Sequence, residues 1–253
     1  MTQGRLHSIE SMGLVDGPGI RTIFFLQGCP LRCLYCHNPD SQTMFSKTSI
    51  TPEEVLRIAK RYKTYYKRTG GGITFSGGEP LLQGEFLLES LKLLKKEGFN
   101  TAIDTSGYGD EEYFEEILKY ADVILLDVKQ FDDEGYRKLT GKTMSGFHKF
   151  ISYLNDFGGT IWIRHVMVPS MTDNMESMYK LFNRISHIAD KIDRIEILPY
   201  HKMAMEKYEK LKRQYPLKGI PEMDKSKAKE LENTLMFMLE NEKQRIKESR
   251  EIV

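Results

Sequence analysis

The sequence predicts an α/β protein in which helices cover a parallel sheet. Short segments rich in β-branched and aromatic residues alternate along the chain with longer segments of helical period, and six such β/α units can be counted. Alternation of this kind is typical of parallel strands joined by crossover helices. Two arrangements stay open, a doubly wound sheet and a barrel of six units, because both have the same period.

The first unit consists of a strand at 22–26 and a helix that begins after Thr51. Thr51 is the expected N-cap, Pro52 takes the first helical position, and Glu54 completes a capping box. The helix is expected to end at the glycine run 70–72, because glycine favours helix termination.

The other five units repeat this alternation. Strands are expected at 73–75, 101–103, 123–126, 161–163 and 195–198. Helices are expected from Phe86 to a stop at Gly98, near 113–118, at 147–157 and at 175–189. A last helix, from about 224 to 251, carries the apolar stripe Leu231, Leu235, Met238 and Leu239 and should pack by it. The length fits a single domain, 1–253.

Composition excludes several classes of partner. Lys and Arg number 37 against 36 Asp and Glu, so no basic surface for nucleic acid or anionic lipid is expected. The apolar runs are short, such as Val123–Leu126, and the first residues, MTQGRLHSIE, lack the charged-then-apolar order of a secretory signal. We therefore expect a cytoplasmic protein without a membrane segment.

Ligands of parallel α/β sheets collect at the carboxyl ends of the strands. The positions that follow the predicted strands are polar or rich in glycine: Gln27–Cys29, Ser76–Glu79, Asp104–Ser106, Asp127 with Lys129, Arg164 with His165, and Tyr200 with His201. We expect the functional site at this edge of the sheet.

All three cysteines lie in one loop, at 29, 33 and 36, and His37 follows them directly. In a reducing compartment an odd, clustered set favours metal binding or thiol chemistry over disulfides. A zinc site would need the adjacent Cys36 and His37 to reach one tetrahedral ion. Haem attachment by CxxCH belongs to exported proteins, and a CxxC dithiol would leave Cys29 unused. A [4Fe–4S] cluster held by three thiolates would use all of them and leave one iron free to bind a ligand.

Two motifs together resemble the radical S-adenosylmethionine (SAM) superfamily. One is CxxxCxxC at 29–36, with the aromatic Tyr35 before the last cysteine, and the other is the GGEP run at 77–80, after the second strand. The resemblance implies a partial (β/α)6 TIM-like barrel, SAM as cofactor, and a [4Fe–4S] cluster bound in the loop 28–40 by Cys29, Cys33 and Cys36.

A narrower resemblance covers nearly the whole chain. Its segments are DGPGIR from Asp16, GCPLRCLYCHNPD from Gly28, SGGEP from Ser76, DTSG from Asp104, LDVKQ from Leu126, WIR from Trp162 and LPYH from Leu198. Together they resemble the activating enzymes of glycyl radical enzymes, in particular those of pyruvate formate-lyase. The cysteine-rich, ferredoxin-like insert that many related activases carry is missing from this sequence.

The resemblance implies a reaction and its partners. SAM would be cleaved reductively at the cluster, and the resulting radical would take a hydrogen atom from a glycine Cα of pyruvate formate-lyase under anaerobic conditions. The electron donor would be flavodoxin or ferredoxin, and the enzyme would be a monomer. The alternatives are an activase of another glycyl radical enzyme and a radical SAM enzyme that acts on a small molecule.

The resemblance also assigns residues. SAM would be held by Tyr35, Asn38, Gly77, Gly78, Glu79, Asp104, Thr105, Asp127, Lys129, Arg164 and His201. Asp104 and Thr105 would also bind a monovalent cation, Na+ or K+. The glycyl segment of the partner would lie along Asp16, Gly17, Gly19 and Arg21. Simpler roles are open too: Glu79 as a helix cap, Asp127 with Lys129 as a mutual ion pair, Asp104 with Thr105 as a turn after the strand, and Asp16 as the cap of a glycine–proline turn. A buried Arg164 needs an anion, which favours a ligand contact.

Overall fold

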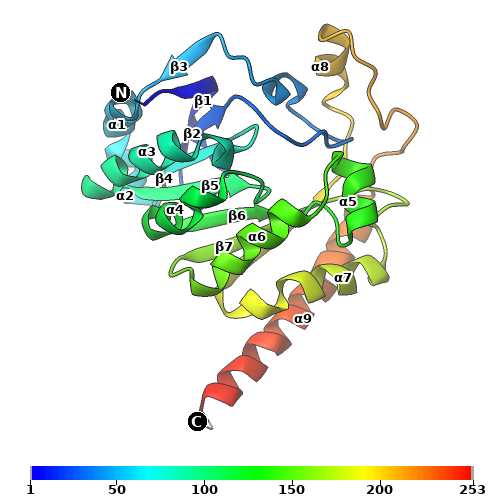
Figure 1. The fold of residues 1–253 in the computed structure, drawn as a ribbon. Helices are drawn as coiled ribbons and strands as arrows, with labels where there is room; N and C mark the ends of the chain where they lie inside the picture. Colours follow the sequence, from blue (N-terminus) through cyan, green and yellow to red (C-terminus); the bar gives the residue numbers. More distant parts are fainter. Residues whose placement is uncertain (1, 252–253) are drawn as a thin grey trace.

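The computed structural model describes residues 2–251, and its centre is one eight-stranded sheet (Figure 1). Six strands are parallel and follow one another in chain order: β2 (Arg21–Leu26), β4 (Gly72–Gly77), β5 (Asn100–Thr105), β6 (Val123–Asp127), β7 (Thr160–Met167) and β8 (Ile192–Pro199). The α/β prediction with six units is confirmed. A doubly wound sheet would reverse its strand order midway, and this order does not. Within residues 2–251 the sheet also does not close, since β8 pairs with β7 alone, as a partial barrel requires.

Two further strands were not predicted. β1 (Gly4–Gly13) pairs antiparallel with β2, and β3 (Thr48–Ile50) pairs antiparallel with the start of β1. Alternating burial holds only in the first part of β1, and its middle residues are all exposed. A strand with so little buried surface has no hydrophobic pattern that a sequence reading can detect.

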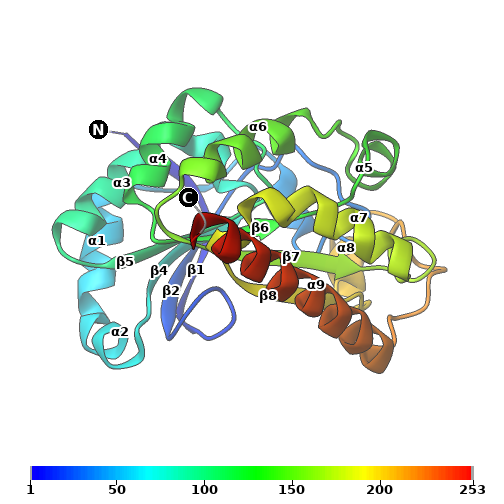
Figure 2. The same cartoon turned by 90° about the horizontal axis from the view of Figure 1, so that it is seen from below.

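The helices between the parallel strands form an arc along one side of the sheet (Figure 2). They are α1 (Pro52–Arg61), α2 (Lys63–Thr69), α3 (Gly84–Lys96), α4 (Phe114–Tyr120), α6 (Ser145–Tyr153) and α7 (Met175–Ile185). Short 3-10 turns are η1 (Pro39–Gln42), η2 (Pro80–Gln83), η3 (Glu111–Tyr113), η4 (Leu154–Asp156) and η5 (Ser186–Lys191). The two helices predicted at 147–157 and 175–189 are therefore shorter, and each continues into a 3-10 turn.

The predicted capping box is present at the start of α1. The Thr51 side chain accepts from the Glu54 amide, and the Glu54 carboxylate accepts from the Thr51 amide. The predicted single helix up to the glycine run is divided at Tyr62 into α1 and α2, and α2 ends at Gly70 in the left-handed conformation.

Two short helices, α5 (Asp133–Thr140) and α8 (Met205–Lys210), were missed by the sequence analysis. Both lie beside the cysteine loop. The end of α5 accepts hydrogen bonds from the backbone of that loop, and Lys207 of α8 donates to the side chain of Asn38 at 2.6 Å. They are therefore part of the surroundings of the thiols.

The C-terminal helix α9 (Lys225–Glu251) packs by the predicted stripe, against β8 and α7. Leu231, Leu235 and Leu239 are buried, and Met238 is partly buried. Neither α9 nor any other helix within residues 2–251 combines the length and apolar character needed to cross a membrane.

Two neighbouring side chains on α9 are expected to respond very differently to truncation. Leu235 has no exposed surface, whereas Phe237 is 68% exposed. Leu235→Ala should lower the free energy of unfolding by about 2–5 kcal/mol because it leaves a cavity. Phe237→Ala, the matched control, should change it by less than about 0.5 kcal/mol. Urea unfolding measures both values, and equal losses would mean that α9 does not pack by this stripe.

Candidate active site

A cavity of about 250 Å³ lies at the carboxyl ends of the parallel strands, the edge where the sequence predicts the site. It brings together many of the predicted residues: Asp16, Cys29, Cys33, Tyr35, Cys36, Asn38, Gly77, Gly78, Glu79, Asp104, Thr105, Asp127 and Lys129. The predicted residues outside its lining are Gly17, Gly19, Arg21, Arg164 and His201.

The loop that carries the cysteines is fixed from two sides by its backbone. The amides of Arg32 and Leu34 donate to carbonyls at the end of α5, at 2.7 and 2.9 Å. On the other side, the amide of Gly28 donates to the carbonyl of Ser41 in η1 at 2.8 Å. The three thiols therefore stand on a loop whose path is set by α5 and η1.

The Gly77–Glu79 turn is attached directly to the cysteine loop. The Glu79 amide donates to the Gly28 carbonyl at 2.8 Å, and the Gly78 amide donates to Leu26 at 2.8 Å. Gly77 has a φ of 112°, which residues with a side chain rarely adopt. A Cβ on Gly78 would lie 2.1 Å from the Gly28 carbonyl oxygen. Both glycines are required by this close approach of two backbones.

Glu79 is buried and its carboxylate is fully hydrogen-bonded. It accepts from the Thr105 hydroxyl at 2.5 Å, and from the amide and hydroxyl of Ser106 at 2.8 and 2.6 Å. It also accepts from the Leu81 amide at 3.2 Å, so the helix-cap role is present at η2. Burial raises the pKa of Glu79, although these hydrogen bonds oppose the shift. The three bonds from β5 and the segment after it go beyond what a cap requires.

Asp127 and Lys129 form the mutual ion pair that the sequence left open. The Lys129 ammonium lies 2.5 Å from the Asp127 carboxylate, and both side chains are mostly buried. Burial is the largest influence on the pKa of Lys129 and would lower it, but the charge of Asp127, the other acidic groups nearby and the hydrogen bond to Asp127 together raise that pKa well above its usual value. The ammonium also lies 5.9 Å from the centre of the Tyr35 ring, which brings it close to the cysteine loop.

Arg164 is the centre of a buried charge cluster. Its guanidinium lies 3.1 Å from Glu196, 3.5 Å from Asp104 and 3.9 Å from Asp16, and it donates to the Val15 carbonyl at 2.9 Å. Burial, followed by the charge of Asp104, raises the pKa of Asp16 to about 6. Carboxylates of the protein supply the anion that a buried arginine needs, so burial alone does not indicate a ligand contact here.

The predicted cation site has partners within the protein. Asp104 accepts from the Ser76 hydroxyl at 2.7 Å, and the Thr105 hydroxyl donates to Glu79. Among residues 2–251, no three His, Cys, Asp or Glu side chains are close enough to share one metal ion. The cation at Asp104 and Thr105 stays a prediction.

His201 reaches the cavity only through another histidine. Its ring stacks on that of His37, with centroids 4.2 Å apart and planes inclined by 29°. His37 itself lines the cavity. Burial, then the neighbouring His201, lowers the pKa of His37. The two stacked rings therefore form an aromatic surface beside the cysteine loop.

Arg21 differs from the rest of the DGPGIR segment because it has no exposed surface. It donates to the Thr74 hydroxyl at 2.6 Å and to the Pro18 carbonyl at 3.0 Å. Gly17 and Gly19 both have positive φ, so the turn that Arg21 stabilises depends on glycine. Arg21 can support a peptide site only through the loop that it holds.

Comparisons with known proteins agree with this geometry. A family model described as "Radical SAM superfamily" matches residues 23–182. A pyruvate formate-lyase-activating enzyme from Clostridium pasteurianum is 54% identical over 240 residues, which are 95% of this chain and 100% of that protein. The chain belongs to the radical SAM superfamily, in the family of pyruvate formate-lyase-activating enzymes.

Further similarities support the same family. A pyruvate formate-lyase-activating enzyme from Staphylococcus epidermidis is 44% identical over 237 residues, 91% of this chain and 94% of that protein. The crystal structure of a radical SAM methyltransferase from Sphaerobacter thermophilus superposes with a TM-score of 0.62, at 15% identity, over 93% of this chain and 75% of that one. At that identity the structural likeness concerns the fold alone.

Radical SAM enzymes use a [4Fe–4S] cluster and SAM, and the thiols of this chain fit such a cluster. The side chains do not converge on one point as a zinc ion would require, whereas a cubane takes each thiolate at a different iron. Burial raises the pKa of all three thiols, that of Cys33 to about 12, so cluster binding must release their protons. The buried hydroxyls of Tyr35 and Tyr136 have no hydrogen-bond partner among the described residues, as expected where a further group with acceptor atoms belongs.

The strand-end rule included Ser106 but gave it no role, and the structure shows that it gives Glu79 two hydrogen bonds. Sequence reasoning missed two other residues near the thiols. Lys207 reaches Asn38 from far along the chain, and Tyr136 lies on the unpredicted α5. Neither of these two has a local sequence signal.

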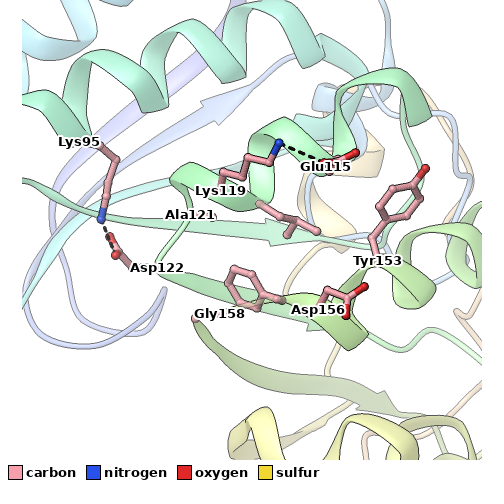
Figure 3. Close-up of a pocket in the computed structure, with 11 residues that line it drawn as sticks. Lys95, Glu115, Lys119, Ala121, Asp122, Tyr153, Asp156 and Gly158 are labelled. Carbon is pink, nitrogen blue, oxygen red and sulfur yellow. Dashed lines mark hydrogen bonds and ion pairs between the residues drawn. The ribbon is translucent and has the colours of Figure 1, made fainter.

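A larger cavity of about 640 Å³ lies at the opposite edge of the sheet, near the starts of β6 and β7 (Figure 3). Its lysines are paired with acidic side chains: Lys95 with Asp122 at 2.6 Å and Lys119 with Glu115 at 3.1 Å. No cysteine lines it. Size alone would therefore select the wrong cavity for radical SAM chemistry.

Proposed function

We propose that this protein activates pyruvate formate-lyase by generating a glycyl radical on it. The observation that carries the proposal is the 54% identity to an enzyme of that name across its whole length. The cavity supports it, because the thiols and the Gly77–Glu79 turn line one space. When bound, the cluster and SAM supply the chemistry: one electron cleaves the sulfonium to methionine and a 5′-deoxyadenosyl radical, which removes a hydrogen atom from the glycine Cα and ends as 5′-deoxyadenosine.

The residues of the chain bind and orient the reactants in this proposal. Cys29, Cys33 and Cys36 hold the cluster. Glu79 attracts the ammonium of SAM by its negative charge, since its oxygens already accept four hydrogen bonds within the protein. The hydrogen bonds from Thr105 and Ser106 hold its carboxylate in place for that contact.

The other predicted contacts are proposed on the same basis. Asp127 and Lys129 bind the ribose and the carboxylate of SAM. Asp104 and Thr105 hold a monovalent cation beside that carboxylate. Tyr35, Asn38, Gly77, Gly78 and His201 surround the rest of SAM, and Arg164 positions Asp104 and Asp16. Asp16, with Gly17 and Gly19, receives the glycyl segment of the lyase, while Arg21 supports their loop.

We also propose the setting of the reaction. The enzyme acts as a single-domain monomer in the cytoplasm, and flavodoxin or ferredoxin delivers the electron. These proposals rest on the family and on the near-neutral composition, with 37 basic and 36 acidic residues.

The test mixes the anaerobically reduced protein with SAM and inactive pyruvate formate-lyase. An electron paramagnetic resonance doublet from a glycyl radical is expected, together with 5′-deoxyadenosine and methionine in equal amounts. Release of both products without a doublet would reject this lyase and favour another glycyl radical enzyme or a small substrate. Failure to cleave SAM at all would reject the reaction itself. A sample without SAM is the control.

A further inference from the structure

Tyr136 is placed against the outer side of the cysteine loop. The amides of Arg32 and Leu34 donate to the carbonyls of Thr140 and Leu139 at the end of α5. Tyr136 precedes these two residues by four and three positions, so all three share one face of the helix. All three are buried, and Tyr136 has no exposed surface at all.

The hydroxyl of Tyr136 is buried and has no hydrogen-bond partner among the described residues. Its helix is hydrogen-bonded to Arg32 and Leu34, the residues on either side of Cys33. Tyr136 therefore packs beside the part of the loop that carries this thiol. A tyrosine hydroxyl keeps its proton near neutral pH and is a hydrogen-bond donor there.

Two charged side chains of the site, Glu79 and Lys129, have no acceptor left for this proton. The Glu79 carboxylate already takes four hydrogen bonds, from Leu81, Thr105 and Ser106. The Lys129 ammonium is itself a donor and is paired with Asp127. A buried donor without an acceptor costs free energy, so a group that belongs in this space should supply one.

We propose that the Tyr136 hydroxyl donates a hydrogen bond to a sulfur atom of the [4Fe–4S] cluster, either the Cys33 thiolate or a sulfide, and so raises the reduction potential of the cluster. Hydrogen bonds to sulfur are among the features that set the potential of iron–sulfur clusters. Reduction adds negative charge to the cluster, and a donor stabilises the reduced form more than the oxidised form. Tyr136 thereby makes the cluster easier to reduce by the electron donor.

The test compares the midpoint potentials of the cluster-loaded wild type, Tyr136→Phe and Tyr153→Phe. Tyr136→Phe removes only the hydroxyl, so the potential should become more negative. At a fixed applied potential the ratio of reduced to oxidised cluster should fall by about tenfold, which corresponds to 59 mV for a one-electron couple. Tyr153→Phe is the same chemical change beside the remote cavity (Figure 3) and should leave the potential unchanged.

Two further measurements keep the proposal falsifiable. Tyr136→His retains a donor and should stay closer to the wild-type potential than Tyr136→Phe. Electron–nuclear double resonance of the reduced cluster should show an exchangeable proton that Tyr136→Phe lacks. Equal potentials in Tyr136→Phe and the wild type, or equal shifts in the Phe and His variants, would overturn the inference. Should Tyr136→Phe hold no cluster, Tyr136→Met serves as the non-donor variant.

This inference rests on the cluster of the proposed function and not on its protein substrate. A wild-type chain that assembles no [4Fe–4S] cluster would defeat the proposed function. A loaded wild type whose potential is insensitive to Tyr136→Phe would defeat the inference about Tyr136 alone.

Discussion

Cys33→Ser is expected to abolish cluster binding and SAM cleavage together. The three cysteines are the only thiols of the chain, so the loop has no spare ligand. A serine hydroxyl loses its proton far less readily than a thiol, and iron–sulfur clusters are held by thiolates. Iron analysis should fall from about four irons per chain to background. Release of 5′-deoxyadenosine should become undetectable, while circular dichroism stays that of the wild type.

His37→Ala is the matched control for that experiment. His37 lines the same cavity directly beside Cys36, but a cluster held by three thiolates does not need it. The variant should retain its iron. Equal loss of metal in His37→Ala and Cys33→Ser would support a site in which the histidine is a ligand, such as zinc. Turnover by Cys33→Ser would also contradict the assignment.

Gly78→Ala should push the Gly77–Glu79 turn away from the cysteine loop. The added Cβ would lie 2.1 Å from the Gly28 carbonyl oxygen, which is the acceptor for the Glu79 amide. The two backbones must move apart, because neither contact atom belongs to a flexible side chain. We expect a loss of about 1–3 kcal/mol in the free energy of unfolding. SAM binding should weaken about tenfold, equivalent to about 1.4 kcal/mol.

Gly158→Ala is the control for the glycine experiment. Gly158 borders the remote cavity in Figure 3, and a Cβ there would meet no heavy atom within 4 Å. Its stability should stay within about 0.5 kcal/mol of the wild type. Thermal unfolding and calorimetric titration with SAM measure both variants. Wild-type SAM affinity in Gly78→Ala would refute the role given to this close approach.

Buried helices and strands with a clear periodic pattern of apolar residues were predictable from the sequence, and weakly buried ones were not. Ile73 and Phe75 have no exposed surface, and the strand that holds them is buried over nearly its whole length. β1 instead owes its existence to antiparallel pairing with β2, and its middle residues are exposed. α5 is eight residues long, and its buried face is recognisable only once the cysteine loop packs against it.

The sequence predicted which residues form the candidate site, but not which of their side chains contact one another. The strand-end rule located Glu79, Asp104 and Asp127 because each lies at or just beyond the carboxyl end of a parallel strand. The partners of these side chains depend on which strands are neighbours. Arg164 meets Glu196 from the next strand, 32 residues away, at 3.1 Å. Local sequence contains no information on contacts of that range.

The unclosed sheet determines how a large substrate can reach the chemistry. Within residues 2–251, β3 and β8 are the two outermost strands and do not pair with each other. A complete ring of strands would restrict entry to its mouth, which suits small molecules and chain termini. An interrupted wall allows sideways entry, so that an internal residue of a folded polypeptide can be presented without threading a free end.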